Sequence, residues 1–164
     1  MKAVLAAVAF GSNLGDRAQQ IEAALAALAA HDGVDVLAVS RCLETRPVGG
    51  PPQGDFLNGA VLLRTILDPR GLLELLHHLE RRAGRVREGS VPNAPRPLDL
   101  DLLLHGDSVL DEPGLTVPHP RMHTRAFVLD PLLEVAPSLV HPVLGASVGE
   151  LHAALHDTPS DQVP

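Results

Sequence analysis

The chain has 164 residues, of which 45% are hydrophobic, 20% are charged and 2% are aromatic, and its formal net charge is −7. This length suits one domain with a sizeable core, and the negative charge disfavours a protein that attracts polyanions over a long range. One cysteine excludes an intrachain disulfide and a thiolate metal site, and no apolar run approaches the roughly 20 residues of a membrane span, so we expect a cytoplasmic protein.

The first half of the chain predicts three strands and one helix. An apolar run over residues 2–10 reads as a buried strand, and Asp16 can cap a helix that continues to about Ala30. Strands follow over residues 34–41 and 56–66. The loop between them, residues 46–54, is rich in Gly and Pro and is long enough to be a functional loop.

The second half begins with a helix that starts at Asp68-Pro69 and ends near Ala83-Gly84. A strand over residues 98–104 then completes the order β-α-β-β-α-β, which implies a ferredoxin-like α+β sandwich. Beyond it we expect additional short helices near residues 125–134 and 148–155. The interpretation is one domain over residues 1–156 and a disordered tail over residues 157–164.

Two aspartates lie two residues apart on the last strand of this sandwich. Side chains alternate across a strand, so Asp99 and Asp101 share one face about 6.6 Å apart along the backbone. We expect the leucines between and around them to point the other way into a core: Leu98, Leu100, Leu102 and Leu104. Two such carboxylates can bind one or two hard divalent cations such as Mg²⁺. The alternative is that they only keep a solvent-facing strand soluble.

Five arginines cluster just before this strand: Arg81, Arg82, Arg85, Arg87 and Arg96. The arginine side chain offers a rigid fork of donors that suits phosphate, so the segment can be a phosphate clamp. Alternatively it is a solvated helix end followed by a basic loop. The turn after the first strand, Gly11 to Gly15, matches neither the dinucleotide fingerprint nor the Walker motif.

Few aromatic and histidine residues are candidates for a site. Phe56 and Phe127 could sandwich a flat ligand or plug the core, and Asn58 could read the amide edge of a heterocycle. His119 and His123 have the spacing of a zinc pair, but nearby prolines oppose a helix there, and we prefer one histidine contacting phosphate. We expect the adjacent pair at positions 77 and 78 to be ordinary surface residues.

Five short motifs occur together in this order: Phe10 to Asp16, Asp55 to Asn58, Gly84 to Arg87, Pro95 to Asp101, and Val117 to Met122. Taken together, they resemble the 6-hydroxymethyl-7,8-dihydropterin pyrophosphokinase family of folate biosynthesis. The resemblance implies transfer of the terminal pyrophosphoryl group of ATP to the hydroxymethyl oxygen of the pterin, with release of AMP.

The resemblance also implies a role for each site residue. Two Mg²⁺ ions would be held by Asp99 and Asp101, which form the catalytic set with Arg85 and Arg96. ATP would be bound by Glu80, Arg85, Arg87, Arg96, Leu102, Thr116, His119 and Arg125. The pterin would be bound by Thr45, Val48, Phe56, Asn58, Asp99 and Phe127. The Gly/Pro-rich loop and the arginine-rich loop would act as lids.

Three other functions stay open at this point. The chain could be a ferredoxin-like regulatory domain that senses a small ligand, or a metal-dependent phosphoesterase that needs no pterin. A nucleic-acid-binding protein of the same fold is disfavoured because the sheet lacks exposed aromatic residues and the net charge is negative. We expect a monomer that binds ATP and the pterin, with neither nucleic acid nor a membrane as a partner.

Overall fold

A computed structural model of the chain describes residues 2–47, 50–84 and 97–157. Its strands are β1 (Val4–Ser12), β2 (Val34–Val39), β3 (Leu43–Thr45), β4 (Phe56–Thr65), β5 (Asp99–His105), β6 (Leu110–Glu112) and β7 (Leu115–Val117). Its helices are α1 (Arg17–Ala30), α2 (Pro69–Arg82), α3 (Ala126–Val135) and α4 (Val148–Asp157), with a 3-10 turn at Met122–Thr124.

Both helices of the βαββαβ unit begin where their capping residues predict. The Asp16 carboxylate accepts a hydrogen bond from the backbone N–H of Gln19 at the start of α1. The Asp68 carboxylate accepts one from Gly71 at the start of α2, and Pro69 occupies the first turn. These side chains satisfy donors that the helix itself leaves without partners.

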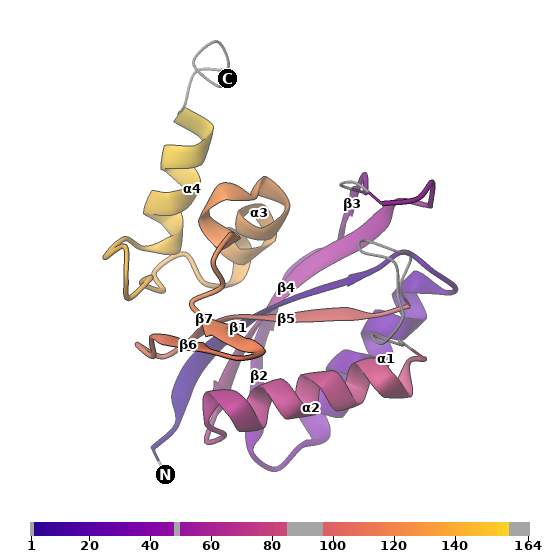
Figure 1. Cartoon of the computed structure of the whole chain (residues 1–164), viewed down its shortest axis with the longest axis horizontal. Helices are drawn as coiled ribbons and strands as arrows, with labels where there is room; N and C mark the ends of the chain where they lie inside the picture. Colours follow the sequence, from indigo (N-terminus) through magenta and orange to yellow (C-terminus); the bar gives the residue numbers. More distant parts are fainter. Residues whose placement is uncertain (1, 48–49, 85–96, 158–164) are drawn as a thin grey trace.

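The four long strands form one antiparallel sheet in the order β2-β4-β1-β5, and β3 extends it beside β4 (Figure 1). This arrangement confirms the predicted ferredoxin-like sandwich. The short strand β3 and the hairpin of β6 and β7 were not predicted. Helix α4 continues to Asp157, two residues past its predicted end, and the rest of the predicted tail, residues 158–164, lies outside the described residues. The division into one domain stays a prediction.

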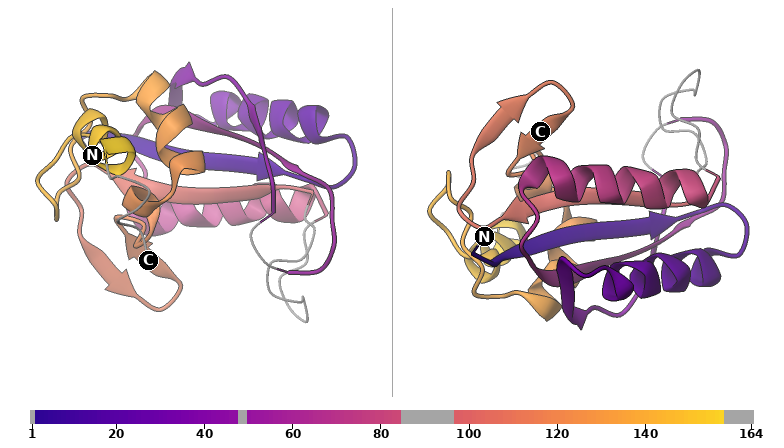
Figure 2. Two further views of the ribbon diagram at one scale, coloured as in Figure 1. Left: turned by 90° about the horizontal axis from the view of Figure 1, so that it is seen from above. Right: turned by 90° about the horizontal axis from the view of Figure 1, so that it is seen from below.

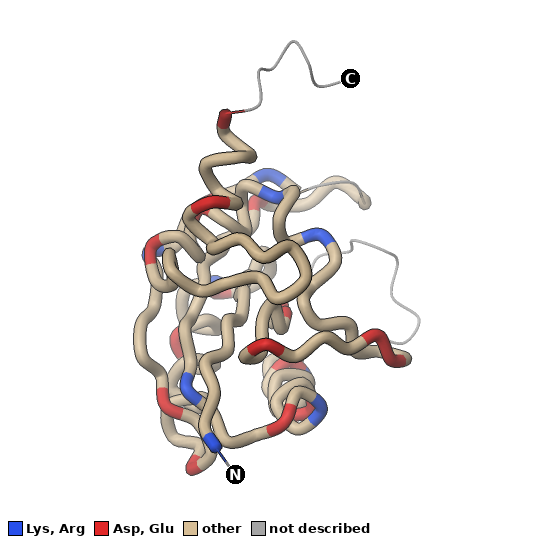
Figure 3. The backbone as a smooth tube through the Cα atoms, turned by 90° about the vertical axis from the view of Figure 1, so that its left-hand side faces the viewer, with Lys and Arg blue, Asp and Glu red and all other residues tan. Residues whose placement is uncertain are grey.

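The sheet is covered on both faces. Figures 1 and 2 show α1 and α2 on one face and α3, with α4 beside it, on the other. The α1/α2 face buries large apolar side chains, among them Val8, Phe10, Leu63, Leu72, Leu76 and Leu100. The α3 face buries a second cluster, among them Ala7, Ala60, Leu103, Met122, Val128 and Leu132. Figure 3 shows acidic and basic residues spread along the described backbone.

One predicted side-chain direction is wrong. Leu98, Leu100 and Leu102 point into the α1/α2 core as expected, whereas Leu104 packs in the α3 cluster next to Leu103. The register of β5 against β1 shifts between Ala7 and Val8. An extra residue on one strand interrupts the alternation of faces, so the leucines beyond it change sides.

Every helix within the described ranges is too short or too polar to cross a bilayer.

Candidate active site

The paired aspartates lie on the α3 face of the sheet, in register with a row of very small residues. Across the sheet, Asp99 is paired with Gly11, which is paired with Asn58 on β4. In the next row Asp101 is paired with Ala9, which is paired with Ala60. Residues paired in this way point to the same face. Glycine and alanine therefore leave a shallow floor between Asn58 and the two carboxylates.

A cavity of about 40 Å³ stands over this floor. Its walls bring together six of the predicted site residues, namely Asn58, Asp99, Asp101, His119, Arg125 and Phe127. Both aspartates are half-buried. Oxygen ligands from half-buried carboxylates on one strand face suit a hard divalent cation, so the residues present fit the magnesium site that the sequence predicts.

Two phenylalanines lie beside the floor, of which Phe127 lines the cavity and Phe56 does not. Phe127 lines it from α3, and the guanidinium carbon of Arg125 lies 5.5 Å from the centre of the Phe127 ring. Phe56 begins β4, and its ring lies 3.6 Å from the point that a Cβ atom would occupy on Gly11. Both rings are half-buried. The two rings therefore stand at the edges of the floor, where a flat ligand could contact them.

The amide of Asn58 is held in place by β3. Its Nδ2 donates a hydrogen bond to the hydroxyl oxygen of Thr45, and Thr45 itself is paired with Phe56. The predicted pterin contact at Thr45 thus lies next to the cavity through Asn58, although Thr45 is not among the cavity's lining residues. Val48 lies outside the described residues.

His119 is fixed against β5. Its backbone N–H donates to the carbonyl of Leu103 at 2.9 Å, and its Nδ1 accepts from the backbone N–H of Arg121 at 3.2 Å. Burial, followed by the charges of Arg125 and Arg121, lowers the pKa of His119, and Asp99 opposes them. Because Nδ1 is an acceptor, neutral His119 carries its proton on Nε2.

A second cavity, of about 280 Å³, lies between α2, β5 and β7. It is lined by Leu73, His77, Leu100, Asp101, Leu102, Gly114, Leu115, Thr116, His119 and Pro120. Two of these residues, Asp101 and His119, also line the first cavity. The two cavities therefore meet at one carboxylate and one imidazole. Leu102 and Thr116, predicted to contact adenosine, both line the second one.

Some predicted site residues are placed elsewhere. Glu80 is 1% exposed, and its carboxylate accepts a hydrogen bond from the backbone N–H of Leu100 at 2.8 Å. It lines neither cavity and holds α2 to β5. Arg85, Arg87 and Arg96 lie outside the described residues, as does most of the predicted arginine-rich lid.

Other residues of the site were missed. Gly11 and Ala9 form the floor of the first cavity, but their role depends on pairing with β4 and β5, which no local pattern shows. His77 was expected to be an ordinary surface residue, yet it lines the second cavity. His123 was paired with His119 by spacing, whereas its ring lies 6.2 Å from that of His141 in an edge-on arrangement.

Comparison with known proteins agrees with the resemblance that the sequence motifs indicate. Residues 7–137 match a family model described as 7,8-dihydro-6-hydroxymethylpterin-pyrophosphokinase (HPPK). A Bacillus subtilis protein named 2-amino-4-hydroxy-6-hydroxymethyldihydropteridine pyrophosphokinase is 47% identical over 131 residues, which cover 80% of this chain and 77% of that protein. A Pseudomonas aeruginosa protein of the same name is 45% identical over 147 residues, which cover 90% of this chain and 89% of that protein.

Among solved structures, the chain is similar to Plasmodium falciparum HPPK-DHPS crystallised with pterin and p-hydroxybenzoate. The TM-score is 0.75 at 15% identity, and the match covers 99% of this chain and 43% of that one. At this identity the likeness shows a shared fold. This chain spans less than half the length of that protein.

Proposed function

Because this chain belongs to the 7,8-dihydro-6-hydroxymethylpterin-pyrophosphokinase family, we propose that it transfers the terminal pyrophosphoryl group of ATP to the hydroxymethyl oxygen of 6-hydroxymethyl-7,8-dihydropterin, with release of AMP. The observation that carries the proposal is the meeting of two cavities at Asp101 and His119. A reaction between two bound substrates needs such a junction, because the attacking oxygen must lie near the phosphorus of the other substrate.

The first cavity is the proposed pterin site. Phe127 and Phe56 would stack on the two faces of the bicyclic ring, and Asn58 and Asp99 would pair with its polar edge, together with the backbone at Thr45 and Val48. Small-molecule sites usually measure about 300–1,000 Å³, so a cavity of about 40 Å³ is too tight as it stands. We expect the Phe127 side chain to move outward when the pterin enters.

Asp99 and Asp101 are the proposed ligands of two Mg²⁺ ions. When bound, these ions supply the positive charge that offsets the charge on the triphosphate and favours deprotonation of the pterin hydroxyl. The two carboxylates, which share one face of β5, would hold the ions. Asp99 lines only the pterin cavity, whereas Asp101 lines both. Asp101 would therefore be the carboxylate that both substrate sites share.

The second cavity is the proposed nucleotide site. Leu102 and Thr116 would contact adenosine. His119 would donate its Nε2 proton to a phosphate oxygen, because its Nδ1 already accepts from the backbone N–H of Arg121. Arg125, which acts on His119 through its charge, would add positive charge there.

Three further nucleotide contacts are proposed from the sequence alone. Arg85, Arg87 and Arg96 would bind the phosphates, with Arg85 and Arg96 in the catalytic set. Glu80 would contribute by fixing Leu100 on β5. The monomeric state and the absence of nucleic-acid and membrane partners stay predictions.

Product analysis tests this function. The purified chain is incubated with ATP and Mg²⁺, with and without the reduced hydroxymethyl pterin, and the nucleotides are separated. The proposal predicts AMP that forms only when the pterin is present. Equal nucleotide breakdown without the pterin would indicate a phosphoesterase and contradict the proposal.

A further inference from the structure

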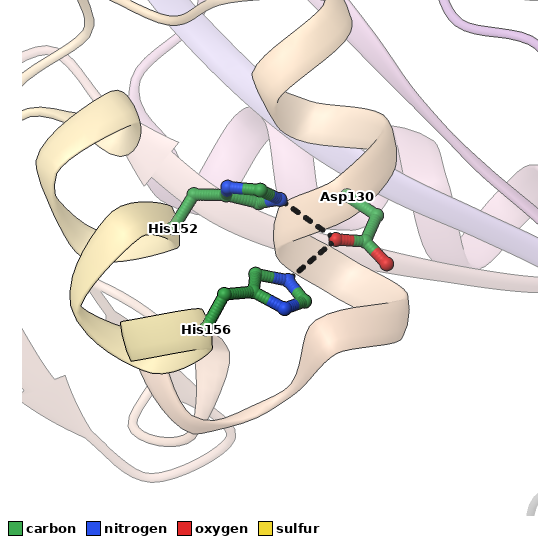
Figure 4. A group of neighbouring side chains, drawn as sticks. All are labelled: Asp130, His152 and His156. Carbon is green, nitrogen blue, oxygen red and sulfur yellow. Dashed lines mark hydrogen bonds and ion pairs between the residues drawn. The ribbon is translucent and has the colours of Figure 1, made fainter. Parts of the chain in front are cut away.

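A second group of possible metal ligands lies away from both cavities. His152 and His156 are four residues apart on α4, so they lie on one side of that helix. Both point toward Asp130 on α3 (Figure 4). Nε2 of His152 lies 2.8 Å and Nε2 of His156 lies 3.1 Å from the same carboxylate oxygen, Oδ1 of Asp130. None of the three lines a described cavity of the proposed active site.

The geometry of the three side chains is close to that of a metal site. One ligand atom from each lies within 4.8 Å of the other two, and the two imidazole rings have centroids 4.3 Å apart. In a tetrahedral site with bonds of about 2.0–2.1 Å, neighbouring ligand atoms are about 3.3 Å apart. The two nitrogen–oxygen distances therefore need to lengthen by only a few tenths of an ångström.

We propose that Asp130, His152 and His156 bind one divalent transition-metal ion of the Zn²⁺ type. Imidazole nitrogen is a ligand for Zn²⁺, Ni²⁺ and Cu²⁺, whereas Mg²⁺ prefers oxygen ligands. Two histidines and one carboxylate leave the fourth position of a tetrahedral ion for water. The side chains are 24%, 38% and 48% exposed for His152, Asp130 and His156, so an ion can reach them without opening the core.

The bound ion would join α3 and α4 through the second half of α4. Among the described residues of α4, Val148 at its first position is the one that is fully buried, and the two histidines lie in its middle and last turns. An ion held by both helices would stabilise α4 on α3, because a ligand that binds only the folded state raises its stability.

Zn²⁺ alone is the probe, added to the chelator-treated full chain without ATP or pterin. Calorimetry gives the stoichiometry and affinity, and thermal unfolding gives the shift in Tm. We expect one ion per chain and a rise in Tm that a chelator reverses. His152→Ala and His156→Ala should each weaken binding by at least about tenfold and remove most of the Tm rise.

The matched control is His78→Ala, an exposed histidine on α2 at the other face of the sheet, which should bind Zn²⁺ as the unaltered chain does. A large excess of Mg²⁺ should not displace the Zn²⁺. Binding that persists in both His152→Ala and His156→Ala, displacement by Mg²⁺, or no binding at all would overturn the proposal. Because the measurement uses neither substrate, its outcome is independent of the proposed enzymatic activity.

Discussion

Gly11 and Asn58 are paired across β1 and β4, and a Cβ atom on Gly11 would lie 2.6 Å from the side-chain oxygen of Asn58. That distance is shorter than real Cβ contacts allow. Asn58 cannot easily yield, because its amide also donates to Thr45. The absence of a side chain at Gly11 therefore leaves room for the Asn58 amide, which lines the first cavity.

Gly11→Ala should displace the Asn58 amide and weaken pterin binding by up to about tenfold, the cost of one hydrogen bond, with ATP binding unchanged. Titration of each ligand measures this. The double variant with Asn58→Ala is the control. If Gly11 acts through Asn58, Gly11→Ala should reduce pterin affinity only slightly in a protein that already carries Asn58→Ala. An equal loss in both backgrounds would contradict this role.

Asp99→Asn and Asp101→Asn keep the shape of each side chain and remove its charge. We expect each to lower kcat by about a hundredfold or more, because charge stabilisation of the transition state is lost. Tm should change little, since both side chains are only half-buried. The control is Asp107→Asn, an exposed acid just beyond β5, which should keep full activity. Full activity in both site variants would exclude a metal role for this pair.

Phe127→Ala should weaken pterin binding by about tenfold, because it removes an aromatic contact worth about 0.5–1.5 kcal/mol beyond its buried area, and it should leave ATP affinity nearly unchanged. Phe127→Tyr retains the stacking ring and should bind the pterin well. Fluorescence or calorimetric titration with each ligand separates the two affinities. Equal losses for both ligands in Phe127→Ala would show a structural role instead.

His141 predicts a pH dependence of stability. It is 5% exposed, and its Nδ1 accepts hydrogen bonds from the backbone N–H groups of Val143 and Leu144. Burial, followed by the charge of His123, lowers the pKa of His141. The folded state therefore disfavours the protonated ring. The contribution of neutral His141 to the free energy of unfolding is present above the pKa of an unfolded histidine, about 6.5. It is lost as the pH falls below that value.

Urea unfolding at a series of pH values between about 7 and 5 tests this prediction. One proton can change the free energy of unfolding by at most about 1.4 kcal/mol per pH unit. His141→Asn offers an acceptor near the position of Nδ1 and does not titrate, so its stability should fall less steeply. Identical slopes for the two proteins would contradict the role of His141.

Local chemistry was enough to predict the four long strands and the helices α1 to α4 of the fold. The caps at Asp16 and Asp68 and the apolar spacing of the helices act within a few residues, so they can be read directly from the chain. Strand β3 and the β6–β7 hairpin have strands of three residues each, which carry too little pattern to identify. The change of face at Leu104 depends on the register between β1 and β5, which only the assembled sheet determines.

The site was predictable where its residues lie close together on one strand. Asp99 and Asp101 show their shared face through their spacing alone. The shallow floor at Gly11 could not be inferred from spacing, because it forms only when β1 lies between β4 and β5. The same holds for Asp130, which lies 22 residues before His152 and meets it only through the packing of α3 against α4.

The most direct test of the proposed activity follows the phosphorus atoms of ATP. Parallel reactions use ATP labelled at the β-phosphorus and ATP labelled at the γ-phosphorus, and the pterin product is isolated from each. Pyrophosphoryl transfer predicts that both labels appear in the pterin product in equal amounts, with unlabelled AMP as the other product. A pterin product that carries only the γ label, or labels found only in inorganic phosphate, would contradict the account.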